Sequence, residues 1–229
     1  MIDVQFITNY FLEKLSLVGK KILITAGPTH EPIDPVRFIG NRSSGKMGVA
    51  LAEICLERGA EVTLVLGPSS QVIPTGNINV IRVKTAAEMF EACQSHFTQD
   101  AVIMSAAVAD YTPVDVAEQK IKKKNTEWSI PLKKTEDILK WMGENKTNQK
   151  LIGFALETNK ELEHAQSKLE RKNLDAIVLN SLNDKGAGFQ TDTNKITIID
   201  RSNKIATFEL KSKKDVANDI VNKLEELLQ

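Results

Sequence analysis

The sequence has little of several features that would define a class of protein at once. Only two of its 229 residues are cysteines, three are histidines and 5% are aromatic. Cys55 and Cys93 cannot form a disulfide framework and show no metal-ligand spacing, so a reducing compartment is expected. Both lie on apolar helix faces, which favours packing over catalysis. The first 21 residues lack a basic start followed by a long apolar run, so they indicate neither a signal peptide nor a membrane span.

An excess of charge of either sign is also missing. Thirty basic and thirty acidic side chains cancel to a formal net charge of zero. A nucleic-acid binder usually shows a basic excess, so no nucleic-acid partner and no membrane are predicted. The apolar fraction of 41% suffices for a core, and the length fits one domain over 1–229 with an N-terminal helical extension over 1–18. We expect a cytoplasmic protein.

Apolar segments alternate with amphipathic segments along the chain. Apolar runs without polar alternation are typical of strands buried on both faces of a parallel sheet, and they occur at 20–26, 60–66, 79–83, 101–105, 150–155 and 175–180. Helical spacing predicts helices at 5–17, 45–59, 86–97, 136–144, 160–171 and 212–227. Two short strands around Ser202-Asn203 predict a small C-terminal hairpin. The alternation predicts a doubly wound, Rossmann-like α/β fold with a mostly parallel sheet.

In open α/β sheets, ligands bind beyond the carboxyl ends of the strands. Three predicted strand ends carry small or polar residues, namely Gly27, then Ser105, Ala106, Ala107 and Asp110, and then Glu157, Thr158 and Asn159. Small residues at Gly27, Ala106 and Ala107 would let a ligand approach the backbone closely. The ligand site is therefore expected where these loops meet.

The run SSGKMG (43–48) opens a predicted helix. Helix-start amides and the helix dipole favour an anion such as phosphate, while N-capping by Ser43 or Ser44 explains the same residues equally well. Gly40 to Met47 matches G-x-x-x-x-G-K, but Met47 stands where a P-loop needs Ser or Thr. The run after the first strand is GPTHEP, which is not a dinucleotide fingerprint. Both absences weigh against P-loop and dinucleotide enzymes.

Residues 106–135 show no stable helical face, and a connection this long is usually functional, so we expect a flap. A lysine cluster within it, Lys120 to Lys124, is typical of a solvated face. Lys120 stands ten residues after Asp110, and its compact ammonium group could close over a triphosphate.

Five blocks occur in a fixed order: GPTHEPIDPVRFIGNRSSGKMG (27–48), SAAVADY (105–111), KIKK (120–123), GFALETN (153–159) and KNLDAIVLN (172–180). Together they closely resemble the phosphopantothenoylcysteine synthetases, over about residues 18–228. The resemblance implies a ligase of coenzyme A biosynthesis that joins 4′-phosphopantothenate and L-cysteine. Family members in bacteria use CTP and Mg²⁺, form an acyl-cytidylate, and release pyrophosphate and CMP. A flavin-dependent decarboxylase often precedes the domain; none precedes it here, so a stand-alone bacterial form is implied, as a homodimer.

The resemblance also implies roles for single residues. Asn41 would hold the acyl-cytidylate, Arg37 and Ala107 would contact phosphopantothenate, and Lys120 would act on the triphosphate. A larger set would contact the nucleotide: Gly27, Ser44, Gly45, Ser105, Ala106, Asp110 on the sugar or its metal, Thr135, Glu136, Asp137, Ile138, Phe154, Lys168 and Lys172. Further metal ligands are not implied. Because the substrate carboxylate is the nucleophile, the protein needs to supply only positioning and charge stabilisation.

The chain departs from the family at several positions. Thr135 to Ile138 reads Thr-Glu-Asp-Ile where Asn-Pro-Asp-Ile is frequent, and Gly40, Arg42 and Leu156 replace other common residues. From spacing alone, Lys168 and Lys172 fit a solvated helix face. Eukaryotic relatives accept ATP, so the choice of CTP stays open. Two other functions also stay open: an NAD(P)-dependent oxidoreductase and a non-catalytic nucleotide-binding module.

Overall fold

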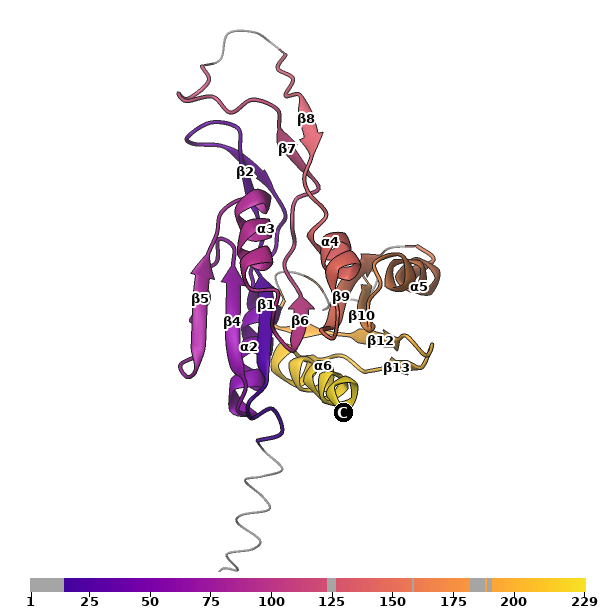
Figure 1. Ribbon diagram of the computed structural model, residues 1–229. Coiled ribbons are helices and arrows are strands. Elements are labelled where there is room, and N and C mark those ends of the chain that lie inside the picture. The colour runs from indigo at the N-terminus through magenta and orange to yellow at the C-terminus, as the bar shows by residue number, and fades with distance from the viewer. Residues whose placement is uncertain (1–14, 123–126, 158, 182–187, 189–190) are drawn as a thin grey trace, which may run out of the picture.

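The computed structural model describes residues 15–122, 127–157, 159–181, 188 and 191–229. Its centre is an eight-stranded sheet with the strand order β13-β12-β10-β9-β6-β1-β4-β5 (Figure 1). Six of these strands are parallel: β1 (Lys21–Ala26), β4 (Glu61–Leu66), β5 (Ile78–Arg82), β6 (Ala101–Met104), β9 (Lys150–Glu157) and β10 (Ala176–Ser181). Numbered in chain order they run 3-2-1-4-5-6, which is the classical doubly wound order. The predicted fold class is confirmed.

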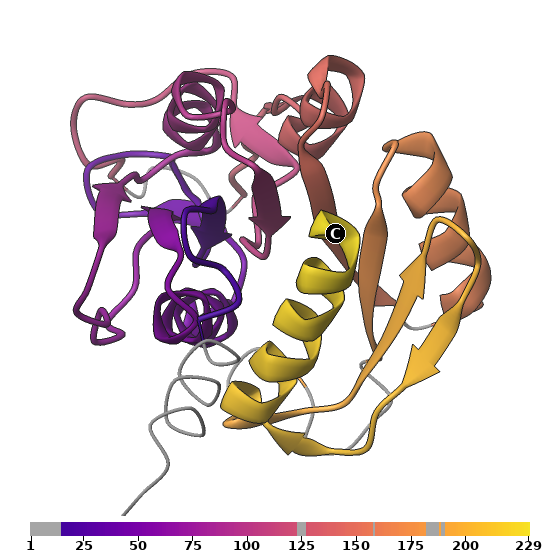
Figure 2. The same cartoon turned by 60° about the horizontal axis from the view of Figure 1, so that its bottom comes forward.

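Helices cover both faces of the sheet (Figures 1 and 2). On one face, α2 (Lys46–Glu57) and α6 (Lys213–Leu228) pack against side chains such as Ile22 and Ile24. On the other, α3 (Ala86–Ser95), α4 (Ile138–Asn145) and α5 (Glu161–Arg171) pack against alternate residues such as Leu23. Burial on both faces explains why the strands are continuously apolar, since each fully buried Leu or Ile contributes roughly 1.5–3 kcal/mol.

The C-terminal hairpin extends the main sheet. Its strands are β12 (Ile196–Asp200) and β13 (Ile205–Thr207), and β12 runs antiparallel to β10. At its turn, Asn203 adopts a left-handed φ of 61°, and the Asp200 carboxylate accepts from the amides of Ser202 and Lys204 at 3.0 and 3.1 Å. The predicted hairpin around Ser202-Asn203 is therefore confirmed. A separate pair, β11 (Thr193–Asn194) and β14 (Lys211–Ser212), leads into α6.

Two hairpins rise above the carboxyl ends of the strands and form what we call the arm, residues 29–40, 111–122 and 127–135 (Figure 1). The first pairs β2 (His30–Pro32) with β3 (Phe38–Gly40), and the second pairs β7 (Tyr111–Pro113) with β8 (Leu132–Lys134). The sequence predicted an irregular flap here. Each strand has only three residues, too few to show a periodic pattern, which is why the β7–β8 pairing was missed.

The predicted N-terminal helix over 5–17 lies mostly outside the described residues, and residues 15–19 form a turn. Among the helices in the described part of the chain, none has the length and apolar character needed to cross a membrane.

Candidate active site

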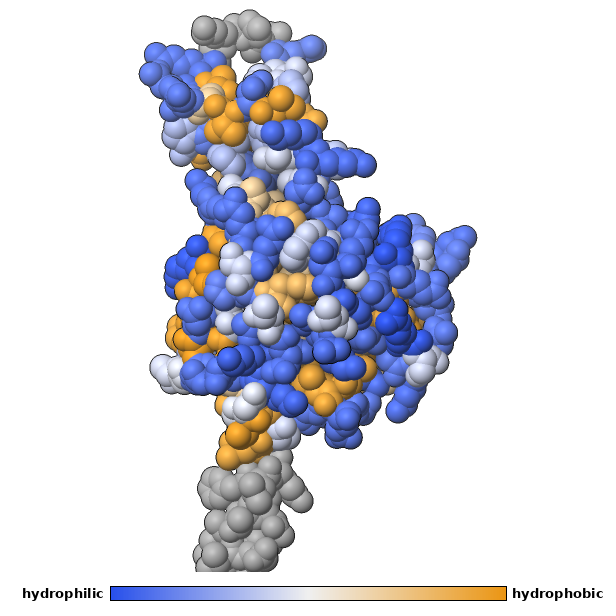
Figure 3. Space-filling model, viewed as in Figure 1, coloured by the Kyte–Doolittle hydropathy of each residue, from blue (hydrophilic) through white to orange (hydrophobic). Residues whose placement is uncertain are grey.

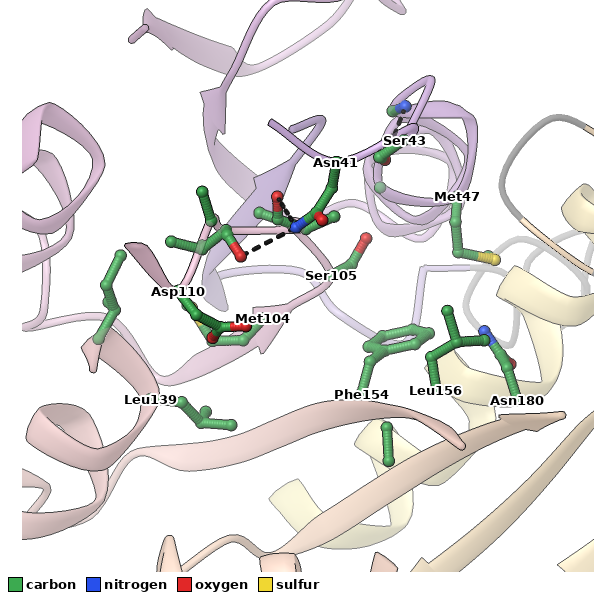
Figure 4. A pocket seen from close by; sticks show the side chains of 18 of the residues that line it. Asn41, Ser43, Met47, Met104, Ser105, Asp110, Leu139, Phe154, Leu156 and Asn180 are labelled. Carbon is green, nitrogen blue, oxygen red and sulfur yellow. Dashed lines mark hydrogen bonds between the residues drawn. The ribbon is translucent and has the colours of Figure 1, made fainter. Parts of the chain in front are cut away.

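A cavity of about 920 Å³ lies at the carboxyl ends of β6 and β9, beside the start of α2 (Figure 4). The crevice between β1 and β6 is where the strand order reverses, the usual ligand position in such sheets. Asn41, Ser105, Asp110, Phe154 and Asn180 surround this space from different elements (Figure 4). The volume is within the range of small-molecule and cofactor sites.

The cavity is cationic although the chain as a whole is neutral. Three acidic residues line it, Asp110, Glu136 and Asp137, against six basic residues: Lys46, Lys134, Lys168, Arg171, Lys172 and Lys213. A concave surface lined by charges of one sign focuses the field and raises the local concentration of ligands of the opposite sign. The site therefore favours an anionic ligand.

The loop that follows β6 forms one wall of the cavity, and threonines hold its backbone in place. The Ala106 amide donates to Thr25 Oγ1 at 3.2 Å, and the Ala109 amide donates to Thr29 Oγ1 at 2.9 Å. From the base of the arm, Thr135 Oγ1 donates to the Ala109 carbonyl at 2.7 Å. These bonds fix the wall before any ligand binds.

Asn41, which directly follows β3, reaches across to the same loop (Figure 4). Its Nδ2 donates to the carbonyls of Ala107 at 3.1 Å and Val108 at 3.0 Å. Both amide hydrogens therefore hold the loop in this state. Donation to a bound substrate, the role implied by the family resemblance, requires at least one of these bonds to open.

The start of α2 forms the opposite wall. Its N-cap is Gly45, which has a left-handed φ of 81° and no side chain with which to cap the first turn. Neither serine is the N-cap residue, but Ser43 Oγ accepts from the Gly45 amide at 3.3 Å and Ser44 Oγ from the Lys46 amide at 3.5 Å, so the predicted role of these serines at the helix start is partly present. A Cβ at Gly48 would lie 2.4 Å from Ala26 Cβ, so glycine is needed for the close approach of α2 to β1. The amides of this turn suit an anion.

Two lysines of the α5 region line the far end of the cavity. Lys172 is only 8% exposed, and its Nζ contacts the carboxylate of Asp137, the N-cap of α4. Burial opposes ionisation of Asp137, but the bonds from Lys172 and from the Lys140 amide hold its pKa below the usual value. Lys168 Nζ donates to the Phe154 carbonyl at 2.8 Å. The interpretation of Lys172 as a solvated surface residue is wrong.

Three residues assigned from the motifs lie outside the cavity: Gly27, Arg37 and Lys120. Gly27 packs against the backbone of another loop and does not line the cavity. A Cβ there would lie 3.2 Å from the Gly67 carbonyl oxygen, and the Gly27 carbonyl accepts from the Ala107 amide at 2.9 Å. Its φ of 80° serves this close packing of loops.

Arg37 and Lys120 lie in the arm. Arg37 Nη2 contacts Asp34 Oδ2 at 2.5 Å and donates to the Ile121 carbonyl at 3.0 Å, and its guanidinium lies 4.6 Å from the centre of the Trp128 ring. Lys120 is exposed beside Ile121. The structure therefore does not bring either residue to Asn41.

Other cavity residues were missed by the sequence analysis, among them Lys46, Lys134, Arg171, Asn180, Asn194 and Lys213. Lys213 is 7% exposed, and burial lowers its pKa. It shares a helix face with Val216, Ala217 and Ile220, which are also buried. A lysine at the apolar spacing of an amphipathic helix was the signal that could have identified it. Among the described residues, no group of three or more His, Cys, Asp or Glu side chains could hold a metal ion.

A doubly wound sheet with a cationic cavity at its strand-order reversal defines an α/β protein built to hold an anionic small molecule. Comparison with known families agrees. The chain matches the family described as "DNA/pantothenate metabolism flavoprotein C-terminal domain" over residues 17–228, and it belongs to that family. The resemblance predicted from the five blocks is confirmed at this level.

Curated relatives are longer than this chain. The coenzyme A biosynthesis bifunctional protein CoaBC of Bacillus subtilis is 46% identical over 224 residues, covering 96% of this chain and 55% of the relative. A protein named cysteine/cysteine sulfinic acid decarboxylase, from an unknown prokaryotic organism, is 53% identical over 223 residues, covering 96% of this chain and 62% of the relative. The chain thus spans between half and two thirds of the length of these relatives, and it corresponds to one part of each of them.

Solved structures show the same fold. The C-terminal domain of a CoaBC protein has a TM-score of 0.80 and 43% identity, covering 93% of this chain and 98% of that one. A Cab2 variant in complex with phosphopantothenate-cysteine has a TM-score of 0.71 at 17% identity, covering 98% of this chain and 91% of that one. At that identity the second likeness supports the fold alone.

Proposed function

We propose that the chain is a ligase of coenzyme A biosynthesis that joins 4′-phosphopantothenate to L-cysteine at the expense of CTP. The observation that carries the proposal is the cationic cavity at the strand-order reversal, whose lining includes all of the residues assigned from the motifs except Gly27, Arg37 and Lys120. Family membership and the name of the CoaBC relatives support the same reaction.

Two substitution steps make up the proposed reaction, and each forms one bond and breaks another. The phosphopantothenate carboxylate attacks the α-phosphate of CTP, which forms an acyl-cytidylate and releases pyrophosphate. The cysteine amine then attacks the acyl carbon, which forms the amide and releases CMP. Neither step needs a nucleophile from the protein. The protein contributes position and charge compensation, which are the main sources of acceleration in phosphate chemistry.

The walls of the cavity divide these tasks. The start of α2, with Ser44 and Gly45, is the proposed site of the phosphate chain, because its N-cap is a glycine whose missing side chain leaves room for an anion near the helix-start amides. Asn41 is the proposed donor to the acyl-cytidylate, next to Ala106 and Ala107, whose small side chains leave room for the reacting groups. Charge that develops on the leaving pyrophosphate would be compensated by the lining lysines.

The base and sugar are assigned to the other end. Residues 135–138 approach the cavity at the start of α4, with Phe154, Lys168 and Lys172 opposite. The hydroxyl and amide of Thr135 are bonded to Ala109 and Asp110, so the side chain of Thr135 acts on the nucleotide through the wall that it holds. Glu136, Asp137 and Ile138 are the proposed contacts to cytosine.

Mg²⁺ fits this site as a partner of the phosphates. Mg²⁺ is usually held by one or two carboxylates together with substrate phosphates and waters, so a cluster of protein ligands is not required. Asp110 lines the cavity beside Ser105 and Ala106 and is the carboxylate that would hold it. When bound, the ion would neutralise phosphate charge.

The arm has two proposed roles, closure of Lys120 toward the triphosphate and contact with a second copy of the chain. Figure 3 shows hydrophobic residues on the arm as well as on the body of the molecule. The exposed large apolar side chains of the arm are Val36, Phe38, Tyr111, Val114, Val116, Trp128 and Leu132. Exposed patches of this kind typically mark interaction surfaces. A homodimer through the arm would cover this surface and could bring Arg37 to phosphopantothenate.

The test is a nucleotide panel. CTP, ATP, GTP and UTP are each incubated with 4′-phosphopantothenate, cysteine and Mg²⁺, and pyrophosphate and nucleoside monophosphate are quantified. We expect release with CTP that depends on both other substrates. Tight CTP binding without turnover would select the non-catalytic module, and NAD(P) binding at micromolar Kd in place of CTP would select the oxidoreductase.

A further inference from the structure

At the α2 end of the cavity, a buried lysine holds the neighbouring chain segment in place. Lys213 Nζ donates to the carbonyls of Gly188 at 2.9 Å and Thr191 at 2.6 Å, and the Lys213 amide donates to the Asp192 carbonyl at 2.9 Å. The adjacent Thr193 pairs with Ser212 in the β11–β14 ladder. The backbone on both sides of Asp192 is therefore fixed to the start of α6.

The side chain of Asp192 has a different environment from its backbone. It is 86% exposed, and its carboxylate contacts the ammonium group of Lys46, the first residue of α2. Lys46 lines the cavity, whereas Asp192 does not. The hydrogen bond from Lys46, followed by the nearby charges of Lys46 and Lys213, lowers the pKa of Asp192, so this carboxylate is ionised at neutral pH.

We propose that Asp192 is a built-in counter-ion of Lys46, which the polyphosphate chain of the nucleotide displaces when it binds at the start of α2. Lys46 thereby becomes a further phosphate-positioning residue. Asp192 lowers the affinity of the site for anions, because an incoming phosphate has to displace it from Lys46. The inference rests on the proposed function only in taking a polyphosphate as the ligand. The identity of the base and the chemistry of ligation do not enter it.

Charge and geometry both favour an exchange of partners. Lys46 is the first residue of α2 and lines the cavity, so a phosphate at this helix start would gain the amides, the helix dipole and Lys46 together. The Lys46–Asp192 pair is solvent-exposed on the Asp192 side and therefore weak. A weak pair that is fixed in place holds the ammonium at the rim of the cavity and still releases it to a more highly charged partner.

The test measures binding of CTP and of inorganic tripolyphosphate by calorimetry, with Mg²⁺ present, in a double-mutant cycle of Asp192→Asn and Lys46→Met. We expect Asp192→Asn to tighten both ligands about two- to fivefold, the strength of an exposed ion pair. Lys46→Met should weaken both by roughly tenfold or more, as for loss of a charged hydrogen bond. In the Lys46→Met protein, the gain in binding free energy from Asp192→Asn should be less than half of the gain that it gives in the unmodified protein. Cytidine, which has no phosphate, should bind equally to all four proteins.

Two variants serve as controls. Glu53→Gln removes the same charge from α2, where Glu53 pairs with Lys214 at 2.8 Å away from the cavity, and should change CTP binding by less than about 1.5-fold. Asp192→Glu keeps the counter-ion and should bind like the unmodified protein. Melting temperatures confirm that each variant is folded.

The outcomes separate this inference from the proposed function. If Asp192→Asn raises ligand affinity equally in the unmodified and the Lys46→Met protein, Asp192 acts only by repelling phosphate. That result would overturn the proposal that Asp192 is the counter-ion of Lys46. Unchanged or weaker binding by Asp192→Asn would overturn it as well. Absence of binding of both CTP and tripolyphosphate to the unmodified protein would sink both proposals. If the double-mutant cycle gives the expected affinities for tripolyphosphate but the protein shows no CTP-dependent ligation, the counter-ion proposal holds and the ligase proposal is rejected.

Discussion

The crevice and the arm contain residues from the same continuous motif, but they are stabilised differently. In the crevice, functional side chains bond to backbone carbonyls of other elements, as Asn41 bonds to Ala107 and Lys168 to Phe154. In the arm, Arg37 is bonded to Asp34 and Ile121, and both of these residues belong to the arm as well. The crevice is thus fixed by the sheet, whereas the arm is fixed mainly by its own contacts. Only three residues separate Arg37 from Asn41 in sequence, yet the two belong to different structural units.

The strongest test of the crevice is Asn41→Asp. The variant loses both amide donors and places a carboxylate against the carbonyls of Ala107 and Val108 and near the substrate phosphates. We expect kcat to fall by about 10²–10³-fold, the cost of removing one preorganised donor. The measurement is steady-state pyrophosphate release, with the melting temperature recorded in parallel.

Asn145→Asp is the matched control for Asn41. Asn145 Nδ2 donates to the Trp141 carbonyl at 2.8 Å on the exposed end of α4, away from the cavity. Its kcat should stay within about twofold of the unmodified protein, the range of ordinary surface substitutions. Full turnover by Asn41→Asp would remove Asn41 from the proposed chemistry.

The arm is tested by Lys120→Met. If the arm closes over the triphosphate, loss of the ammonium should lower kcat/KM by roughly ten- to hundredfold, as for a charged hydrogen bond. Lys122→Met, two residues along the same exposed segment, should have little effect. Equal behaviour of the two variants would show that the arm supports no chemistry and would leave the reaction to the crevice alone.

Arg37→Met should loosen the arm without disturbing the sheet. The variant loses the bonds to Asp34 and Ile121 and the contact with the Trp128 ring. Hydrogen exchange of the Ile121 amide, which donates to Asp34 Oδ2 at 3.1 Å, should accelerate about tenfold, as for loss of a charged hydrogen bond of ~1.5 kcal/mol. Amides of β1 and β6 should keep their protection.

Arg201→Met is the comparison for Arg37, because Arg201 contacts Asn173 at the opposite edge of the molecule. It should leave the Ile121 amide unchanged. Uniformly faster exchange in the sheet and the arm of Arg37→Met would show that the two units unfold together. It would contradict the conclusion that the arm is stabilised independently of the sheet.

The smallest effect is expected for the pH dependence of the Asp137–Lys172 pair. The folded pKa of Asp137 lies below its ordinary value of 3.8, so its contribution to stability is present above that value and is lost as pH falls below it. Asp137 is half exposed, which limits the contribution to about 1 kcal/mol or less. The difference in unfolding free energy between the unmodified protein and Lys172→Met should therefore shrink between pH 6 and pH 3, measured by urea unfolding. A constant difference would mean that Lys172 stabilises by packing alone.

The sequence predicted the sheet well because its strands are long, apolar and separated by amphipathic helices. It failed for the arm, since pairing of Tyr111-Thr112-Pro113 with residues 132–134 depends on contacts about twenty residues apart and leaves no local pattern. The resemblance selected cavity residues by motif and therefore could not show that Gly27 and Arg37 are used for packing. Lys46 belonged to the run assigned to anion binding but was not itself assigned a role, and Lys213 was missed although it stands at an apolar position of an amphipathic helix.

CTP, Mg²⁺ and the homodimer stay predictions, and each depends on a different part of the molecule. In the proposal, the choice of base is assigned to residues 135–138, the ion to Asp110, and the second copy to the apolar side chains of the arm.

The cavity draws its walls from segments between Asn41 and Lys213, including both halves of the doubly wound sheet. A contiguous fragment that contains them all must span at least residues 41–213, so neither half of the chain can retain the complete site after cleavage. Ligand affinity is therefore tied to the integrity of the entire fold: saturating ligand should protect distant sheet amides and raise the melting temperature of the whole cooperative unit. Thermal-shift screening should consequently report occupancy of this crevice even for ligands that contact only one wall.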